Sequence, residues 1–319
     1  MRHILSLLFI SFIFANDQIP GTDQKRPILL KGGTLHTVSG DILEGYDLLF
    51  ANGKIVTIDE QIQPSPETDV YDIYGQHVVP GYIAGYTRIG LTEIGLVKQT
   101  NDHSEIGEIN PNVRANVSYN PDSDLIPVTR SNGVLIVNSA PASGRISGQS
   151  SVMMLDGWTW EKATLKAPAG LHINWPNMGT VRFRRYRVSE EDAAKRREET
   201  LKKLDSAFDE ARRYLLAQQA DTGSGIIQHN KDLRWEAMVP VLKKEVPVFM
   251  HAGEIRQIIS AVEWANRQNV KIVIVGGYDA WRVADLLKKY EIPVIYEGVN
   301  SLPRRRWEDF ETPFTAPLK

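Results

Sequence analysis

From Pro80 onward, short apolar segments alternate with helix-like segments, and this alternation limits the fold more than any other feature of the 319-residue chain. The clearest strand-like segments are Tyr82–Thr87, Val134–Asn138, Pro247–Ala252, Lys271–Gly276 and Pro293–Glu297, with Val152–Leu155 and Leu171–Trp175 as further candidates. Apolar residues recur at helical spacing in the segments Glu190–Gln219, Ile255–Gln268 and Asp279–Tyr290. Strands that alternate with helices of this kind predict βαβ units and a parallel sheet.

The chain before Pro80 has a different pattern, in which short β-like runs are separated by turn residues. The candidate strands are Ile28–Lys31, Thr34–Val38, Tyr46–Phe50, Lys54–Ile58 and Val70–Tyr74. Asn52-Gly53 separates two of these runs, which is a strong signal for a tight β-hairpin. We therefore expect residues 27–79 to form a small antiparallel β unit and residues 80–319 to form the α/β unit.

The first residues resemble a secretory signal. Arg2 supplies a positive charge, and Ile4–Ala15 is a mostly apolar run, shorter than the roughly 20 residues of a membrane span. We expect residues 1–15 to be a signal peptide, residues 16–26 a linker, and the mature protein to be periplasmic or secreted, with no membrane contact after cleavage. An uncleaved N-terminal anchor is the alternative.

The composition excludes several classes of site and partner. The chain has no cysteine, so it forms neither disulfides nor thiolate metal sites. Its formal net charge of −2 gives no reason to expect a nucleic-acid partner. A small-molecule substrate or ligand is the expected partner, and the oligomeric state is open, with a homo-oligomer among the alternatives.

The most specific motif lies at residues 79–91. It resembles the pattern Pro-Gly-hydrophobic-Ile-Asp-x-His-x-His, with which the barrel of the amidohydrolase superfamily begins. The residues that fit this pattern are Pro80, Gly81, Ile83, Thr87 and Gly90. The resemblance extends over residues 27–319 and points to the imidazolonepropionase-like branch. It implies a (β/α)8 TIM-like barrel preceded by a small β-sandwich domain, and hydrolysis of a non-peptide C–N bond such as that of a cyclic amide.

Several metal ligands that this resemblance implies are replaced in the chain. Tyr86 and Arg88 stand at the two histidine positions of the first strand, and Gly276-Gly277 stands where a sixth-strand histidine would lie. Arg88 is permanently cationic and offers only hydrogen-bond donors, so it cannot bind zinc. His251 ends an apolar strand and matches the fifth-strand histidine, which makes it the candidate ligand for one divalent metal ion, zinc.

The expected substrate pocket therefore contains Tyr86, Arg88, His251, Gly276 and Gly277, with Arg88 placed to hold a carboxylate or an oxyanion. A single histidine can equally line a pocket with its ring nitrogens bonded to neighbours, so both interpretations of His251 stay open. Two functions follow. One is a hydrolase with an altered or depleted metal site, and the other is a catalytically silent barrel that binds a ligand or serves as a scaffold.

Two polar segments are expected to lie in loops beside this pocket. Asn101–Glu105 carries groups that could rebuild a displaced site, although a solvated loop is the commoner explanation. Ser143–Ser150 is rich in glycine and serine and is expected to be flexible.

The chain also contains fewer residues after Pro80 than the roughly 250 of a complete (β/α)8 barrel, and residues 91–190 include a long insertion. We therefore expect a barrel that is incomplete at its C-terminus, in a sequence that is part of a longer chain.

Overall fold

The computed structural model describes residues 19–179, 189–220 and 230–319, which divide into two compact units. The first unit comprises the described residues up to Ile83 together with Thr129–Leu135, and the second comprises Ala84–Val128 and Ile136–Lys319. The expected signal peptide, residues 1–15, lies outside the described residues. In the described part of the chain, no helix combines the length and apolar character needed to cross a membrane.

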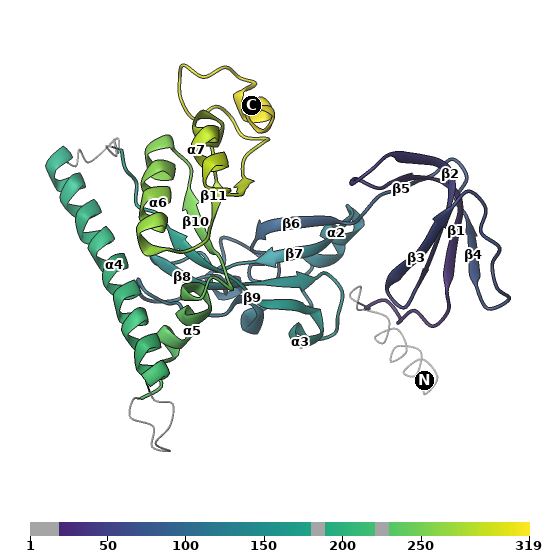
Figure 1. Ribbon diagram of the computed structural model, residues 1–319, viewed down its shortest axis with the longest axis horizontal. Helices are drawn as coiled ribbons and strands as arrows, with labels where there is room; N and C mark the ends of the chain where they lie inside the picture. Colours follow the sequence, from purple (N-terminus) through teal and green to yellow (C-terminus); the bar gives the residue numbers. More distant parts are fainter. Residues whose placement is uncertain (1–18, 180–188, 221–229) are drawn as a thin grey trace, which may run out of the picture. The chain divides into compact units, whose positions relative to one another are not determined.

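The first unit contains one five-stranded sheet in the order β3-β2-β1-β4, with β5 also paired to β1 (Figure 1). Its strands are β1 Ile28–His36, β2 Ile42–Ala51, β3 Lys54–Asp59, β4 Asp69–Asp72 and β5 His77–Val78. Strand β1 pairs antiparallel with β2 but parallel with β4 and β5, so the expectation of a wholly antiparallel unit is wrong. Residues 60–68 supply the longer connection that a parallel pairing requires. The expected sandwich arrangement stays a prediction.

The turn residues of this unit behave in two different ways. Asn52 and Gly53 adopt φ angles of 52° and 70° between the paired strands β2 and β3, which confirms the hairpin and its primed turn. The Gly32-Gly33 pair does not separate two strands, because β1 continues through it with a bulge between Leu30 and Thr34. Gly32 takes a φ of 74°, which glycine adopts without strain, so the strand bends and does not end.

The main sheet is barrel-like and nearly closed, with seven strands in the order β12-β11-β10-β9-β8-β7-β6 (Figure 1). Its strands are β6 Tyr82–Thr87, β7 Val134–Ser139, β8 Ile146–Met154, β9 Thr164–Asn174, β10 Val248–Ala252, β11 Ile272–Gly276 and β12 Val294–Tyr296. The two outermost strands approach each other, since a Cβ atom on Gly85 of β6 would lie 3.3 Å from Cδ1 of Ile295 in β12. The eightfold form of the barrel stays a prediction.

Strand β8 departs from the expected parallel pattern. The pairs β9–β10, β10–β11 and β11–β12 are parallel, whereas β8 runs antiparallel to both β7 and β9. The candidate strand Val152–Leu155 is thus the end of an antiparallel excursion. The expected flexible loop Ser143–Ser150 is wrong from Ile146 onward, because these residues are buried in β8. Gly148 fits there because it has no side chain. A Cβ atom at this position would lie 2.7 Å from the Val113 carbonyl oxygen.

Helices cover the outer face of this sheet, and the three predicted amphipathic segments correspond to α4, to α6 and to the region of α7. The α-helices are α2 Leu125–Ser131, α3 Trp160–Ala163, α4 Glu190–Ala220, α5 Leu233–Leu242, α6 Ile255–Gln268, α7 Ala284–Lys289 and α8 Thr312–Thr315. The 3₁₀ turns are η1 Lys98–Thr100, η2 Ala115–Ser118, η3 Ala280–Val283 and η4 Ala316–Leu318. Helix α4 begins as predicted, with the Asp192 amide donating to Ser189 Oγ at 3.0 Å. The predicted helix Asp279–Tyr290 is divided into η3 and α7.

The core lies between the sheet and helices α4, α5 and α6 (Figure 1). Phe208 of α4 and Trp264 of α6 are fully buried in it, with an edge-to-face contact between ring centroids 4.9 Å apart. On β10, Val248 and Met250 belong to this core. Successive side chains of a strand point to opposite faces, so the intervening His251 points into the barrel-like sheet.

Candidate functional site

Four ring side chains meet inside the barrel-like sheet, towards the C-terminal ends of β6, β9 and β10. The ring centroid of Tyr86 lies 5.8 Å from that of His172 and 4.9 Å from that of His251. His172 stacks on Phe249 with centroids 4.8 Å apart and an interplanar angle of 9°. The register of β9 and β10 places His172 directly opposite Phe249, which explains this stack.

The two histidines form a buried, hydrogen-bonded pair. His172 Nδ1 lies 2.9 Å from His251 Nε2, so one imidazole donates and the other accepts. His172 is fully buried, and burial, with the neighbouring His251, holds its pKa well below the usual value. Burial and then the charge of Arg88 lower the pKa of His251 to about 4. Both imidazoles are therefore neutral near pH 7.

Arg88 follows β6 and acts on several groups of the site. The positive charge of Arg88 opposes the burial that raises the pKa of the Tyr86 phenol. The same positive charge contributes to the lowered pKa of His251 and, after burial, of His103. The charge of Arg88 therefore acts on the histidine pair, although Arg88 itself is exposed to solvent.

Glu297 supplies the carboxylate of this site. It follows β12, and its amide donates to the Gly276 carbonyl at 3.1 Å. Burial raises the pKa of its carboxyl group, and the positive charges of Arg304 and Arg88 oppose this shift. A Cβ atom on Gly276 would lie 3.8 Å from Glu297 Oε2, which places the carboxylate above the end of β11. A carboxyl group with a raised pKa is a candidate for proton transfer.

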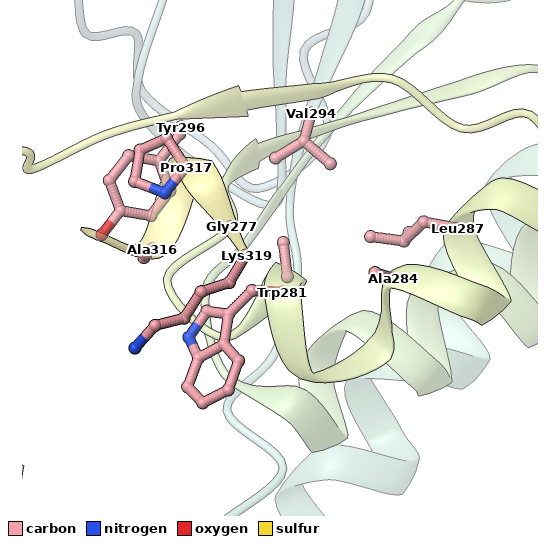
Figure 2. Close-up of a pocket in the computed structure, with 10 residues that line it drawn as sticks. Gly277, Trp281, Ala284, Leu287, Val294, Tyr296, Ala316, Pro317 and Lys319 are labelled. Carbon is pink, nitrogen blue, oxygen red and sulfur yellow. The ribbon is translucent and has the colours of Figure 1, made fainter. Parts of the chain in front are cut away.

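Of the five residues expected in the pocket, the structure brings together Tyr86, Arg88 and His251, with Gly276 beneath Glu297. Gly277 lines a different groove, of about 320 Å³, to which none of the first three belongs (Figure 2). A Cβ atom on Gly277 would lie 2.5 Å from Val294 Cγ1, so the absence of a side chain serves packing there.

The loop residues Asn101–Glu105 contribute one histidine near this site. His103 Nδ1 lies 2.8 Å from Thr92 Oγ1. Burial and then the charge of Arg88 lower the pKa of His103. The described residues contain no group of three or more His, Asp or Glu side chains placed to hold a metal ion, so this loop does not rebuild a metal site there.

The described residues also do not fit a zinc site at the histidine pair. Zinc in proteins takes three or four ligands from the chain. Here the facing nitrogens of His172 and His251 bond to each other, and the nearby Arg88 repels a cation. Zinc binding through His251 stays a prediction, and no chemical step below depends on a metal.

Sequence reasoning missed three residues of the site, namely His172, Glu297 and Arg304. His172 lay in a recognised strand candidate, and a histidine amid apolar strand residues was the available signal. Glu297 ended another recognised strand, at the position where parallel strands present functional groups. Arg304 stood in a basic run that resembled an ordinary solvated surface.

The neutral histidine pair predicts acid sensitivity. Histidine titrates near pH 6.5 in an unfolded chain but near 4 for folded His251, so the unfolded state binds more protons between these values. The free energy of unfolding should therefore fall by about 3 kcal/mol as the pH drops from 6.5 to 4. Tryptophan fluorescence during urea unfolding reports on the second unit, because all 7 tryptophans lie in it.

Two variants check this prediction. His251→Gln should make the dependence on pH shallower, because one titrating group is gone while His172 and Asp279 remain. His77→Gln is the matched control, since His36 and His77 form a second pair at 2.9 Å that is exposed and lies in the first unit. An equally steep dependence in His251→Gln and in the wild-type protein would contradict the assignment.

Comparisons with known proteins agree with the fold. An amidohydrolase from Thermotoga maritima has a similar structure, with a TM-score of 0.77 and 25% identity over 88% of this chain and 72% of that one. Dihydropyrimidinase 2 from Caenorhabditis briggsae is 36% identical over 76 residues, and its Caenorhabditis elegans counterpart is 34% identical over 76 residues. Each of these matches covers 24% of this chain and only 14% of the relative. No protein-family model matches the chain.

Proposed function

We propose that the protein is a hydrolase that acts on a non-peptide C–N bond of a small molecule, such as a cyclic amide. The observation that carries this proposal is the likeness to the Thermotoga maritima amidohydrolase over 88% of the chain. Its support is the polar cluster near the C-terminal ends of the sheet's parallel strands, where the active sites of such barrels lie. The imidazolonepropionase-like branch belongs to the same proposal.

The class of substrate rests on a partial relationship. The chain matches about a seventh of the length of the two dihydropyrimidinases, whose name indicates a dihydropyrimidine ring as substrate. Tyr86 and His251, whose rings contact each other edge to face, are the aromatic side chains on which we propose that a planar ring packs.

The proposed chemistry uses the charged residues of the site. Glu297 accepts a proton from water as this water attacks the amide carbonyl carbon, and later returns it to the leaving nitrogen. Arg88 stabilises the negative charge that develops on the carbonyl oxygen. Arg88 stands at a position where the motif carries a metal ligand. Its positive charge therefore takes over the part of the metal's role that stabilises this oxygen. His251, held by its hydrogen bond with the buried His172, orients the ring by contact and hydrogen bonding.

A second function, a silent barrel that binds a ligand, is favoured by one observation. The two imidazoles bond to each other, and the described residues present no three-ligand metal group that would activate water. The two functions share the site but differ in turnover.

Turnover and metal content together test the proposal. The purified full chain is incubated with dihydrouracil and with hydantoin, with and without added zinc, and ring opening is followed by chromatography. We expect ring opening that falls at least 100-fold in Arg88→Met, because an oxyanion partner is lost. Arg306→Met, an exposed arginine in the chain's last segment, is the control.

The contrary outcome is equally defined. No turnover under any of these conditions supports the silent barrel. Stoichiometric zinc that disappears in His251→Ala would show that a metal binds after all, and would return His251 to the role of a ligand.

A further inference from the structure

We propose that His36 and His77 form a binding site for one divalent copper ion in the first unit. His36 Nε2 lies 2.9 Å from His77 Nδ1, although the two residues are 41 positions apart in the sequence. Their ring centroids are 5.2 Å apart, with an interplanar angle of 40°. The proposed hydrolase site lies in the second unit, so this inference goes beyond the proposed function and does not depend on it.

The sheet of the first unit brings both imidazoles to one face. His36 is the last residue of β1, and the parallel register of β1 and β5 places His77 opposite Thr34. Thr34 and His36 are two residues apart, so their side chains point to the same face of the sheet as that of His77. The Thr34 amide donates to the Gln76 carbonyl at 2.9 Å, which fixes β5 against β1. Ligands carried by paired strands lose little conformational freedom when they bind an ion.

The separation of the two facing nitrogens fits neighbouring ligands of one metal ion. Imidazole nitrogens bind a divalent ion such as zinc at about 2.0–2.1 Å, so two of them lie about 2.9 Å apart at a right angle and about 3.3–3.4 Å apart at the tetrahedral angle. The observed 2.9 Å matches the right angle, which is typical of the square-planar sites of Cu(II) and Ni(II). Of these ions and zinc, copper binds most tightly to a given set of nitrogen ligands.

The charged residues next to this pair in the chain are acidic. Segments 36–44 and 74–80, which carry the two histidines, contain Asp41 and Glu44 but no lysine or arginine. The antiparallel register of β1 and β2 places Glu44 opposite Thr34, on the same face of the sheet as both histidines. A carboxylate on this face attracts a divalent cation.

Exposure to solvent separates this pair from the buried pair of His172 and His251, whose nitrogens are also 2.9 Å apart. His172 is fully buried, and the positive charge of Arg88 acts on His251. The bond between His36 and His77 is open to solvent, so it adds little net stability, and water can supply the remaining ligands of a copper ion. On binding, the donating imidazole carries its proton on its other ring nitrogen, and both facing nitrogens then present lone pairs.

The test titrates copper(II) chloride into the full-length protein by isothermal calorimetry. Every protein carries His3→Gln, because a histidine at the third position of a chain with a free amino terminus binds copper by itself. We expect one copper ion per chain, bound more tightly than nickel or zinc. His36→Gln and His77→Gln should each weaken copper binding by at least about 10-fold, since even the hydrogen-bond partners of metal ligands contribute that much. His103→Gln, which removes a histidine of the second unit, should leave it unchanged.

Electron paramagnetic resonance gives a second measurement on the same proteins. The copper-loaded protein should show coupling to two imidazole nitrogens, and either variant of the pair should show coupling to one. Circular dichroism of the variants should match that of the parent protein, because the pair is exposed and its loss leaves the pairing of β1 with β5 in place.

Several outcomes would overturn the inference. They are the absence of copper binding, unchanged copper affinity in both His36→Gln and His77→Gln, or loss of binding in His103→Gln, which would place the ion in the second unit. Tighter binding of zinc than of copper would reject a square-planar site. Copper binding without ring opening rejects the proposed hydrolase alone, and ring opening without copper binding rejects the copper site alone.

Discussion

Replacing Glu297 by glutamine is expected to lower the turnover of the proposed hydrolase about 100- to 10,000-fold, the contribution of a general base. Glutamine has nearly the same shape but cannot accept a proton. The raised pKa of Glu297 also predicts how the wild-type rate depends on pH. The carboxylate must be ionised to accept a proton, so the rate should rise with pH through this raised pKa and then level off. Rates of ring opening at pH 4–9 measure both effects.

The controls for this variant separate chemistry from folding. The Glu297 residue is exposed to solvent and makes no ion pair among the described residues. The circular dichroism spectrum and the thermal unfolding of the variant should therefore match those of the wild-type protein. Glu311→Gln, another exposed carboxylate of the same C-terminal segment, should retain full activity. A Glu297→Gln protein that turns over at the wild-type rate would exclude this base.

The strands and long helices could be predicted from the sequence because their signals are local. Helix α4 has a serine cap, and apolar residues recur at helical spacing within it. Strand β10 is a short, mostly apolar run in which His251 is the penultimate residue. Strand β8 could not be predicted in the same way, because its first residues are small and polar. These first residues pair with β9, a strand distant in the sequence, so their burial is a property of the whole sheet.

The residues of the site could be predicted only where they correspond to positions of a known sequence motif. Tyr86, Arg88 and His251 correspond to positions of a known pattern, and their proximity follows once a barrel is assumed. The hydrogen bond between His172 and His251 joins residues 79 positions apart, and it depends on the register of two strands. The influence of Arg304 on Glu297 likewise depends on how the segment after β12 folds back. No local pattern contains such information.

The segment that carries Arg304 is held by a buried ion pair, and breaking this pair is expected to destabilise the second unit strongly. Asp279 is only 1% exposed and accepts two hydrogen bonds from Arg305, and its Oδ2 also accepts from the Ile255 amide at 3.1 Å, at the start of α6. Asp279→Ala should lower the free energy of unfolding by about 3–5 kcal/mol, because Arg305 loses a buried partner. This corresponds to a fall in Tm of about 6–20 °C.

Three comparisons sharpen this prediction. Asp279→Asn keeps an acceptor for the Ile255 amide and should lose less stability than Asp279→Ala. Glu198→Ala breaks an exposed pair, with Glu198 and Lys202 2.8 Å apart, and should have no measurable effect. The Asp279 pKa is lowered in the folded protein, so its stabilisation is present above the unfolded pKa and is lost as the pH falls below it. The difference between wild-type protein and Asp279→Ala should therefore shrink in acid.

A stable Asp279→Ala protein would mean that the ion pair does not hold the segment. Arg304 neighbours Arg305 and lies over the Tyr278 ring, 4.6 Å from its centroid, so unchanged stability would show that contacts such as this one hold the segment instead.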